Sequence, residues 1–319
     1  MTFGHSVFTG GHSAIGLSSM LASRVRILTC LLLSLILCAC GAPTQETSDE
    51  DRIIVSGASG NLGELTVHAL LDLGVPASRL ILVSRTPDEL AQFAEMGAST
   101  RYGDFTDAQS LPAAYAGGKR MLLISIGGRN LPASRPELHK RAIDAAIAAG
   151  VEHIAYTSWA AISQGDTAGI SVDHVATEEI LMQSGVAWTM LRNSVYMDGI
   201  PGQAREMVES GRAVIPANDA GMSYVTRADC AAAAAAVLAT PGHENRIYDI
   251  TGPEVVGTRE IAEAAAAVSG TPVEIVEGES GAGGLGLASL GFVTSDVETL
   301  TGRRPTSVRE LLEANSDAL

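Results

Sequence analysis

The chain has 319 residues, of which 46% are hydrophobic and only 18% charged, so it can build one large α/β domain or two small ones. Its formal net charge of −15 argues against a nucleic-acid partner, because neutralising phosphates requires an excess of lysine and arginine. Aromatic residues make up 4% of the chain, and alanine is abundant. We therefore expect a core of small side chains, with helices packed closely on a sheet.

Residues 1–40 read as a leader that lies outside the fold. The apolar run 27–38 follows two arginines and is too short to span a bilayer, whereas its length suits the hydrophobic region of a secretory signal. The segment from Leu37 to Cys40 resembles a bacterial lipobox, in which the last cysteine is lipidated. We expect a lipoprotein anchored to the membrane through Cys40. The alternative is a cytoplasmic enzyme that keeps its leader.

The polar and acidic segment 41–51 is typical of a flexible tether. Translation can start at Met1 or at Met20, and the sequence leaves that choice open. The body beyond the tether holds a single cysteine, Cys230, in an alanine-rich helix. It therefore offers no internal disulfide, and no metal-ligand spacing is present, so no metal site is expected.

The body begins with a buried strand, a glycine turn and a helix. The strand covers 53–56, and apolar residues at helical spacing follow the turn. This context is typical of a dinucleotide site, because glycines let the backbone approach a pyrophosphate and a helix N-terminus attracts its charge. The alternative is an ordinary strand-to-helix turn.

Strands and helices then alternate along the chain. Continuous apolar strands between helices of this length predict an α/β fold, a Rossmann-type doubly wound parallel sheet. We expect the NAD(P)-binding core at 52–198 and a smaller substrate-side α/β region, interleaved with the core, at 199–319. The expected strands are 79–84, 99–102, 120–125, 151–157 and 187–191, then 214–215, 224–225, 247–250 and 273–276; the expected helices include 136–149, 172–184, 201–210, 227–238, 259–268 and 308–314.

Ligands of such sheets bind beyond the carboxyl ends of the strands. Arg85 ends the second strand, where many NAD-binding folds hold an acidic residue, so a cation there favours the 2′-phosphate of NADP(H) over NAD(H). The alternative is a solvated surface arginine. Asp104, followed by Phe105, can reach an adenine amino group or cap the next helix. After the fourth strand, a loop expected to pass close to the cofactor contains Ser125, Ile126 and Gly127.

Several spaced motifs together resemble the NmrA-like atypical short-chain dehydrogenase/reductase family. They are Gly57 to Gly63, Gly103 to Phe105, Ala155 to Ser158, Asp173-His174 with Thr177-Glu178, Leu191 to Asn193, Tyr196, and Thr226 to Asp229. The resemblance implies an NADP(H) cofactor with Arg192 and Asn193 on its nicotinamide side. The residues that it implies for the cofactor phosphates are Gly57, Ala58, Ser59, Gly60, Asn61 and Leu62. It also implies a quinone or another small acceptor that enters from the carboxyl-terminal half.

The chain departs from the family pattern in two places. Val195 stands where the family usually carries a bulky aromatic residue. The segment from Glu277 to Phe292 is short and rich in glycine, where the family has a longer helical stretch. Part of the substrate lid is therefore expected to be missing.

The catalytic candidates are side chains that could donate a proton or a hydrogen bond: Tyr196, His174 and Tyr156. Tyr196 is favoured by its place after the sixth strand. A packing role is the alternative for Tyr156, and a structural hydrogen bond is the alternative for His174. Since neither Tyr156 nor Tyr196 is followed four residues later by lysine, we expect the sequence to hold no Tyr-x-x-x-Lys pair at all, and hydride transfer to proceed without one.

Two classes of function remain. The first is an NAD(P)H-dependent oxidoreductase that passes hydride to a quinone or a similar small acceptor. The second is a non-catalytic NADP(H)-binding redox sensor or regulatory protein of the NmrA type.

Overall fold

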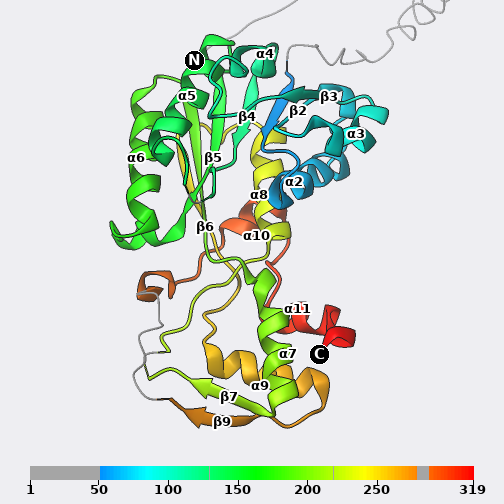
Figure 1. Cartoon of the computed structure of the whole chain (residues 1–319), viewed down its shortest axis with the longest axis vertical. Helices are drawn as coiled ribbons and strands as arrows, with labels where there is room; N and C mark the ends of the chain where they lie inside the picture. Colours follow the sequence, from blue (N-terminus) through cyan, green and yellow to red (C-terminus); the bar gives the residue numbers. More distant parts are fainter. Residues whose placement is uncertain (1–50, 129, 218, 279–286) are drawn as a thin grey trace, which may run out of the picture. The chain divides into compact units, whose positions relative to one another are not determined.

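The computed structural model describes residues 51–128, 130–217, 219–278 and 287–319. These residues belong to one compact unit, Asp49–Leu319 (Figure 1). The predicted leader with Cys40, and the tether up to residue 50, lie outside the described residues. So does most of the predicted glycine-rich segment, at 279–286.

The body is built on a seven-stranded sheet in the order β3-β2-β1-β4-β5-β6-β8, and every pairing in it is parallel. The order reverses between β1 and β4, which is the mark of a doubly wound fold and confirms the predicted fold class. The strands are β1 (Ile53–Ser56), β2 (Leu80–Ser84), β3 (Ser99–Tyr102), β4 (Arg120–Leu123), β5 (His153–Trp159), β6 (Ala187–Asn193) and β8 (Arg246–Ile250).

Helices cover both faces of this sheet (Figure 1). On one face, α2 (Asn61–Asp72) packs against the alanine-rich α8 (Arg227–Ala239), and α10 (Asp296–Thr301) packs against α8. Alanine suits α8 because small side chains let α2 and the strands approach closely. The other face carries α4 (Leu111–Tyr115), α5 (Arg135–Ala148) and α6 (Ile170–Gln183). Shorter elements on the chain are η1 (Ala77–Arg79), η2 (Pro87–Leu90), α3 (Ala91–Glu95), η3 (Ala160–Gln164), η4 (Met197–Gly199), η5 (Leu287–Leu290) and η6 (Ser316–Ala318).

A second, smaller core forms around three helices and a two-stranded sheet. Its elements are α7 (Ile200–Ser210), β7 (Arg212–Ile215), α9 (Thr258–Ser269), β9 (Glu274–Glu277) and α11 (Val308–Ala314). The strand predicted at 273–276 thus exists as β9, and it pairs in parallel with β7. The strand predicted at 224–225 is reduced to an isolated bridge between Tyr196 and Val225. Within the described residues, no helix combines the length and the apolar character needed to cross a membrane.

Candidate functional site

Backbone hydrogen bonds tie the glycine turn after β1 to the neighbouring strand. The N–H groups of Gly57 and Ala58 both donate to the carbonyl of Val83, at 2.9 and 3.0 Å. Gly57 has a φ of 89°, and a Cβ on Gly63 would lie 2.1 Å from the Gly57 carbonyl oxygen. Glycine is therefore required at both positions. No side chain caps the start of α2, so its first N–H groups remain available to an anion such as a pyrophosphate.

A cavity of about 610 Å³ opens at the carboxyl ends of the strands. This volume falls in the range of small-molecule sites. The cavity brings together nine of the predicted cofactor residues: Gly57, Ser59, Gly60, Arg85, Asp104, Phe105, Ser125, Ile126 and Gly127. Five others do not line it: Ala58 and Leu62 have buried side chains, Asn61 is exposed, and Arg192 and Asn193 belong to β6.

One wall of the cavity carries three hydroxyl groups beside a guanidinium. Ser59 Oγ lies 2.6 Å from Ser84 Oγ, and Thr86 Oγ1 lies 3.4 and 3.3 Å from these two atoms. Arg85 stands among them with an exposed side chain, and it takes part in no ion pair within the described residues. Hydroxyl donors beside an unpaired guanidinium are the groups that bind a phosphate monoester.

Asp104 stabilises the turn after β3 through two local hydrogen bonds. Its Oδ1 accepts a hydrogen bond from the N–H of Thr106 at 2.8 Å, and its own N–H donates to Ser110 Oγ at 3.0 Å. The helix that follows, α4, has Ser110 at its N-cap and no side-chain cap bond. The structure therefore does not use Asp104 as the cap of that helix, and the residue lines the cavity instead.

Two side chains of α5 hold the backbone N–H and the carbonyl of Ile126 in the loop after β4. His139 Nε2 accepts a hydrogen bond from the Ile126 N–H at 2.9 Å, and Arg135 Nε donates to the Ile126 carbonyl at 2.8 Å. His139 Nδ1 lies 2.9 Å from Thr177 Oγ1, whose hydroxyl donates to the Asp173 carbonyl. These bonds assign the imidazole proton to Nδ1. Burial, helped by the charge of Arg135, lowers the pKa of His139 to about 3, so the imidazole stays neutral.

Reasoning from the sequence missed His139 and Arg135. His139 carries a weak signal, because it shares the buried face of α5 with apolar residues. A histidine on such a face often makes a satisfied core hydrogen bond, so the sequence alone did not connect it to the cofactor loop. The connection depends on how α5 packs beside β4.

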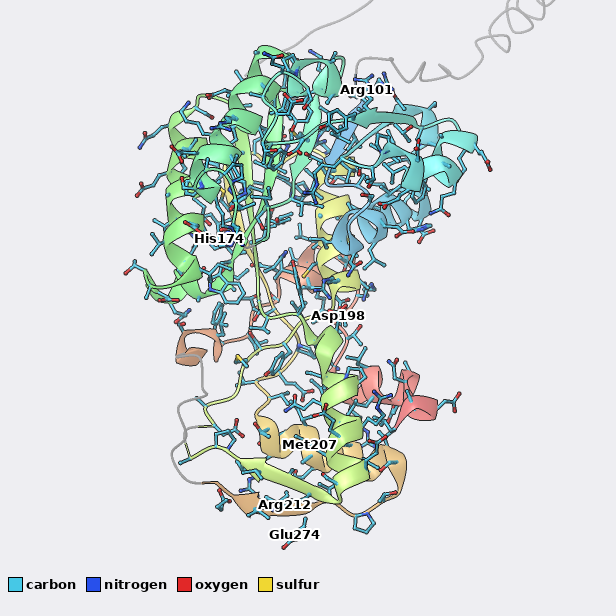
Figure 2. The ribbon with its side chains drawn as sticks, viewed as in Figure 1. Arg101, His174, Asp198, Met207, Arg212 and Glu274 are labelled. Atoms are coloured by element: carbon cyan, nitrogen blue, oxygen red, sulfur yellow. The ribbon has the colours of Figure 1, made fainter. Side chains whose placement is uncertain are left out.

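Tyr156 and His174 lie in the core between the sheet and helices α5 and α6, where Figure 2 labels His174. The Tyr156 side chain is fully buried, and its hydroxyl lies 2.9 Å from His174 Nδ1. Burial raises the pKa of Tyr156 and lowers the pKa of His174 to about 4. The two side chains therefore form a neutral, buried pair, and the cavity lining contains neither of them.

Tyr196 occupies a different environment, in the segment that follows β6. Asn193 Nδ2 donates to the Tyr196 hydroxyl at 3.3 Å, and the Arg227 guanidinium lies 4.4 Å from the centre of the Tyr196 ring. Arg227 also pairs with Asp198 at 2.9 Å; Figure 2 labels Asp198 just ahead of α7. Burial raises the pKa of Tyr196, so the phenol keeps its proton at neutral pH. Because Asn193 donates to the phenol oxygen, the phenol proton is free to bond elsewhere.

Arg192 is held by a buried carboxylate. Its Nε and Nη2 donate to both oxygens of Glu178, at 2.9 and 2.6 Å, and its Nη1 donates to Ser163 Oγ at 2.9 Å. The side chain of Glu178 is 4% exposed, so this bidentate pair is shielded from water. Ser158 adds a further hydrogen bond to Glu178. Arg192 thus joins β6 to α6, whereas the resemblance implied a place beside the nicotinamide.

One Tyr-x-x-x-Lys spacing does occur, at Tyr115 and Lys119, and reasoning from the sequence overlooked it. The two side chains do not form a catalytic pair. Tyr115 is fully buried with its hydroxyl 3.5 Å from Ser56 Oγ, whereas Lys119 precedes β4 and its Nζ binds Glu152 at 2.6 Å. The described residues also contain no group of three or more histidine, cysteine or acidic side chains that could hold a metal ion.

Comparison with known proteins agrees with this geometry. Residues 57–241 match the family model described as NAD(P)H-binding. The chain is 34% identical over 223 residues to quinone oxidoreductase 2 of Escherichia coli, covering 69% of this chain and 76% of that protein. Triphenylmethane reductase of Citrobacter sp., solved with NADP(H), superposes with a TM-score of 0.74 at 29% identity, covering 84% of this chain and 100% of that one. The NADPH-dependent quinone oxidoreductase of E. coli, solved with NADPH, superposes with a TM-score of 0.72 at 28% identity, covering 82% and 99%.

Proposed function

Since this chain belongs to the NmrA-like, NAD(P)H-binding family of oxidoreductases, we propose that it transfers a hydride from NADPH to a quinone or a similar small conjugated acceptor. The observation that carries the proposal is the cavity beyond the parallel strands, with its glycine turn and with Arg85, which has no ion-pair partner in the described part of the chain. The names of the similar proteins support the acceptor class, because quinones and triphenylmethane dyes are both conjugated ring systems.

The hydroxyl cluster around Arg85 supports NADPH as the preferred cofactor. A 2′-phosphate would receive a hydrogen bond from Ser59 and a charge-assisted bond from Arg85. A ribose 2′-hydroxyl would make no use of the guanidinium charge. The Thr86 hydroxyl donates its proton to Glu89 at 2.7 Å, so Thr86 is not a donor to the phosphate.

Quinone reduction suits a site without a Tyr-x-x-x-Lys pair. The nicotinamide supplies a hydride, and one proton completes the two-electron reduction of a quinone to a hydroquinone. The aromatic ring of the product stabilises its oxyanion, so orientation of the two rings provides much of the catalysis. The chain contributes the fixed peptide of Ile126 on the cofactor side, and Tyr196 is our candidate to donate the proton.

Steady-state kinetics tests the proposal against the alternative of a redox sensor. NADPH is mixed with the purified protein and a panel of benzoquinones and naphthoquinones, and its absorbance at 340 nm is followed. We expect oxidation well above the rate without protein, and a lower KM for NADPH than for NADH. Tight NADPH binding without oxidation would favour the non-catalytic class.

Membrane anchoring through Cys40 is a separate proposal that rests on the leader sequence alone. Mass spectrometry of the N-terminus of the native protein tests it. A diacylglyceryl group on Cys40 would support export, whereas an unmodified N-terminus at Met1 or Met20 would favour the cytoplasmic alternative.

A further inference from the structure

Three buried polar atoms without a partner gather at one end of the sheet. Within the described residues, five buried side-chain polar atoms have no hydrogen-bond partner: Arg52 Nε, Arg120 Nε, Trp159 Nε1, Asn193 Oδ1 and Ser289 Oγ. The two arginine atoms lie at the amino ends of β1 and β4, away from the cofactor cavity. The other three lie at or beside the carboxyl ends of β5 and β6. Native proteins rarely leave such atoms unpaired, so a cluster of them beside a ligand site points to a ligand. The three atoms are closed to water in this structure, so a ligand reaches them by displacing the side chains that cover them.

Trp159 and Asn193 are direct neighbours in the sheet. They are register partners at the ends of β5 and β6, and partners in a parallel sheet place their side chains on the same face. Asn193 is 4% exposed, and its Nδ2 is engaged by Tyr196, which leaves Oδ1 as the unpaired acceptor. The Trp159 indole N–H is an unpaired donor on the neighbouring strand.

Backbone and hydroxyl bonds fix Ser289 to the same end of the sheet. Its neighbour Leu290 accepts hydrogen bonds at its carbonyl from the N–H and the hydroxyl of Ser223, at 2.9 and 3.0 Å. Ser223 Oγ in turn lies 3.2 Å from Ser194 Oγ, directly after β6. Helix η5, which carries Ser289, also packs against η3, which follows Trp159.

Apolar side chains surround these atoms. Trp159, Val195, Met222 and Phe292 are partly buried, and together they pack on a small core that includes Leu290. We call these four residues the Trp159 patch. The cofactor loop lies next to it, because Ser125 N donates to Thr157 Oγ1 at 2.8 Å, and Thr157 is two residues before Trp159 on the same face of β5. The patch thus continues the site beyond the cavity described above.

We propose that the Trp159 patch binds the acceptor, and that the Trp159 N–H and the Ser289 hydroxyl donate hydrogen bonds to its carbonyl oxygens. This proposal rests on the proposed function. Aromatic and aliphatic surfaces with two neutral donors select a flat, uncharged ring that carries carbonyl oxygens, such as a naphthoquinone. Asn193 Oδ1 cannot bond a carbonyl, because it is itself an acceptor. It suits an N–H donor such as the nicotinamide carboxamide. Asn193 would therefore contact the cofactor, whereas Trp159 and Ser289 would contact the acceptor.

Tryptophan fluorescence tests the site without turnover. The chain has two tryptophans, and the second, Trp188, lies in β6 five residues before Asn193. Trp188→Phe therefore leaves Trp159 as the sole indole, and Trp159→Phe leaves Trp188 as the matched control. Each variant is titrated with 1,4-naphthoquinone, with and without NADP⁺, and the data are corrected for absorption by the quinone. We expect saturable quenching of Trp159 and only linear, collisional quenching of Trp188. Equal quenching of the two, or no saturable quenching of Trp159 in either condition, would overturn the proposal.

Kinetics separates failure of the site from failure of the function. Trp159→Phe and Ser289→Ala should each raise the KM for 1,4-naphthoquinone about three- to tenfold, the loss expected for one neutral hydrogen bond. The Kd for NADPH should stay unchanged in both, as it should in the control Ser184→Ala at the end of α6. If the unaltered protein oxidises NADPH with quinones and neither variant changes KM, the site is refuted while the function stands. If it oxidises no NADPH but Trp159 is quenched saturably, the function is refuted while the site stands.

Discussion

The backbone N–H of Ile126 donates a hydrogen bond to His139 Nε2 at 2.9 Å, which ties the cofactor loop to the buried face of α5. A neutral imidazole fixes the N–H of Ile126, and the Arg135 guanidinium fixes its carbonyl. The two bonds set the position of the loop before any ligand arrives. Such preorganisation increases affinity because less ordering is left for binding to impose.

Replacing His139 by phenylalanine should weaken NADPH binding. The Ile126 N–H would lose its acceptor, and a buried donor left unpaired costs about 1–3 kcal/mol. We expect part of this cost to appear as a roughly tenfold rise in the Kd for NADPH, measured by the fluorescence of the bound dihydronicotinamide. The matched control is His153→Phe, since His153 is also buried and bonds a threonine, Thr189, but lies at the amino end of β5. An equal loss of affinity in both variants would contradict the role of His139.

Arg85→Ala should reduce the preference for NADPH over NADH. A charge-assisted hydrogen bond contributes about 1.5–3 kcal/mol, so the Kd for NADPH should rise about 10- to 100-fold. The Kd for NADH should stay nearly constant, because NADH has no 2′-phosphate. Isothermal titration calorimetry at fixed ionic strength measures both values. Arg205→Ala, on the exposed face of α7, controls for the loss of one positive charge. A parallel loss of NADH affinity in Arg85→Ala would refute the assignment.

Arg192→Met should destabilise the fold. The change leaves the Glu178 carboxylate buried without its cation, and breaking such a pair costs about 3–5 kcal/mol. Denaturant unfolding followed by circular dichroism measures the loss. The double change Arg192→Met with Glu178→Leu removes both charges and should recover much of the stability. Normal stability of the single variant together with lost NADPH affinity would indicate contact with the cofactor instead.

The free energy of unfolding should fall as the pH is lowered from about 6.5 to 5. Ordinary carboxylates titrate below this range. Burial lowers the pKa of His139 to about 3 and those of His153 and His174 to about 4. The unfolded chain therefore binds more protons than the folded chain below pH 6.5, and protonation favours unfolding. Each histidine contributes up to about 2 kcal/mol of this loss by pH 5. Urea unfolding at pH 7 and pH 5 measures it, and equal unfolding free energies would contradict the assignment of neutral, buried imidazoles.

Local patterns were sufficient to predict the sheet and the glycine turn. Apolar runs such as Ile53 to Val55 identify buried strands. The spacing of Gly57, Gly60 and Gly63 identifies the turn, because the backbone geometry of a turn depends only on nearby residues. Prediction failed where partners are distant in the chain. The pairing of β7 with β9 joins segments about 60 residues apart, and no local pattern specifies such a partner.

The candidate site likewise contains residues whose positions follow from the local sequence and residues whose positions depend on distant partners. Arg85, Asp104 and Phe105 follow strands directly, so their place at the cavity follows from the topology of the sheet. The partner of Arg192 could not be predicted in this way, because its pairing with Glu178 depends on how α6 packs against β6. The same holds for His139, whose acceptor atom reaches Ile126 only once α5 is in place.

A single-turnover experiment tests the central claim most directly. The preformed complex of the protein with one equivalent of NADPH is mixed anaerobically with excess 1,4-naphthoquinone in a stopped-flow instrument, and absorbance at 340 nm is recorded. We predict a single-exponential loss of one equivalent of NADPH, much faster than in a mixture without protein, with a rate that saturates as the quinone concentration rises. An absorbance that decays only at the rate of the free reagents, with NADPH still bound, would contradict it.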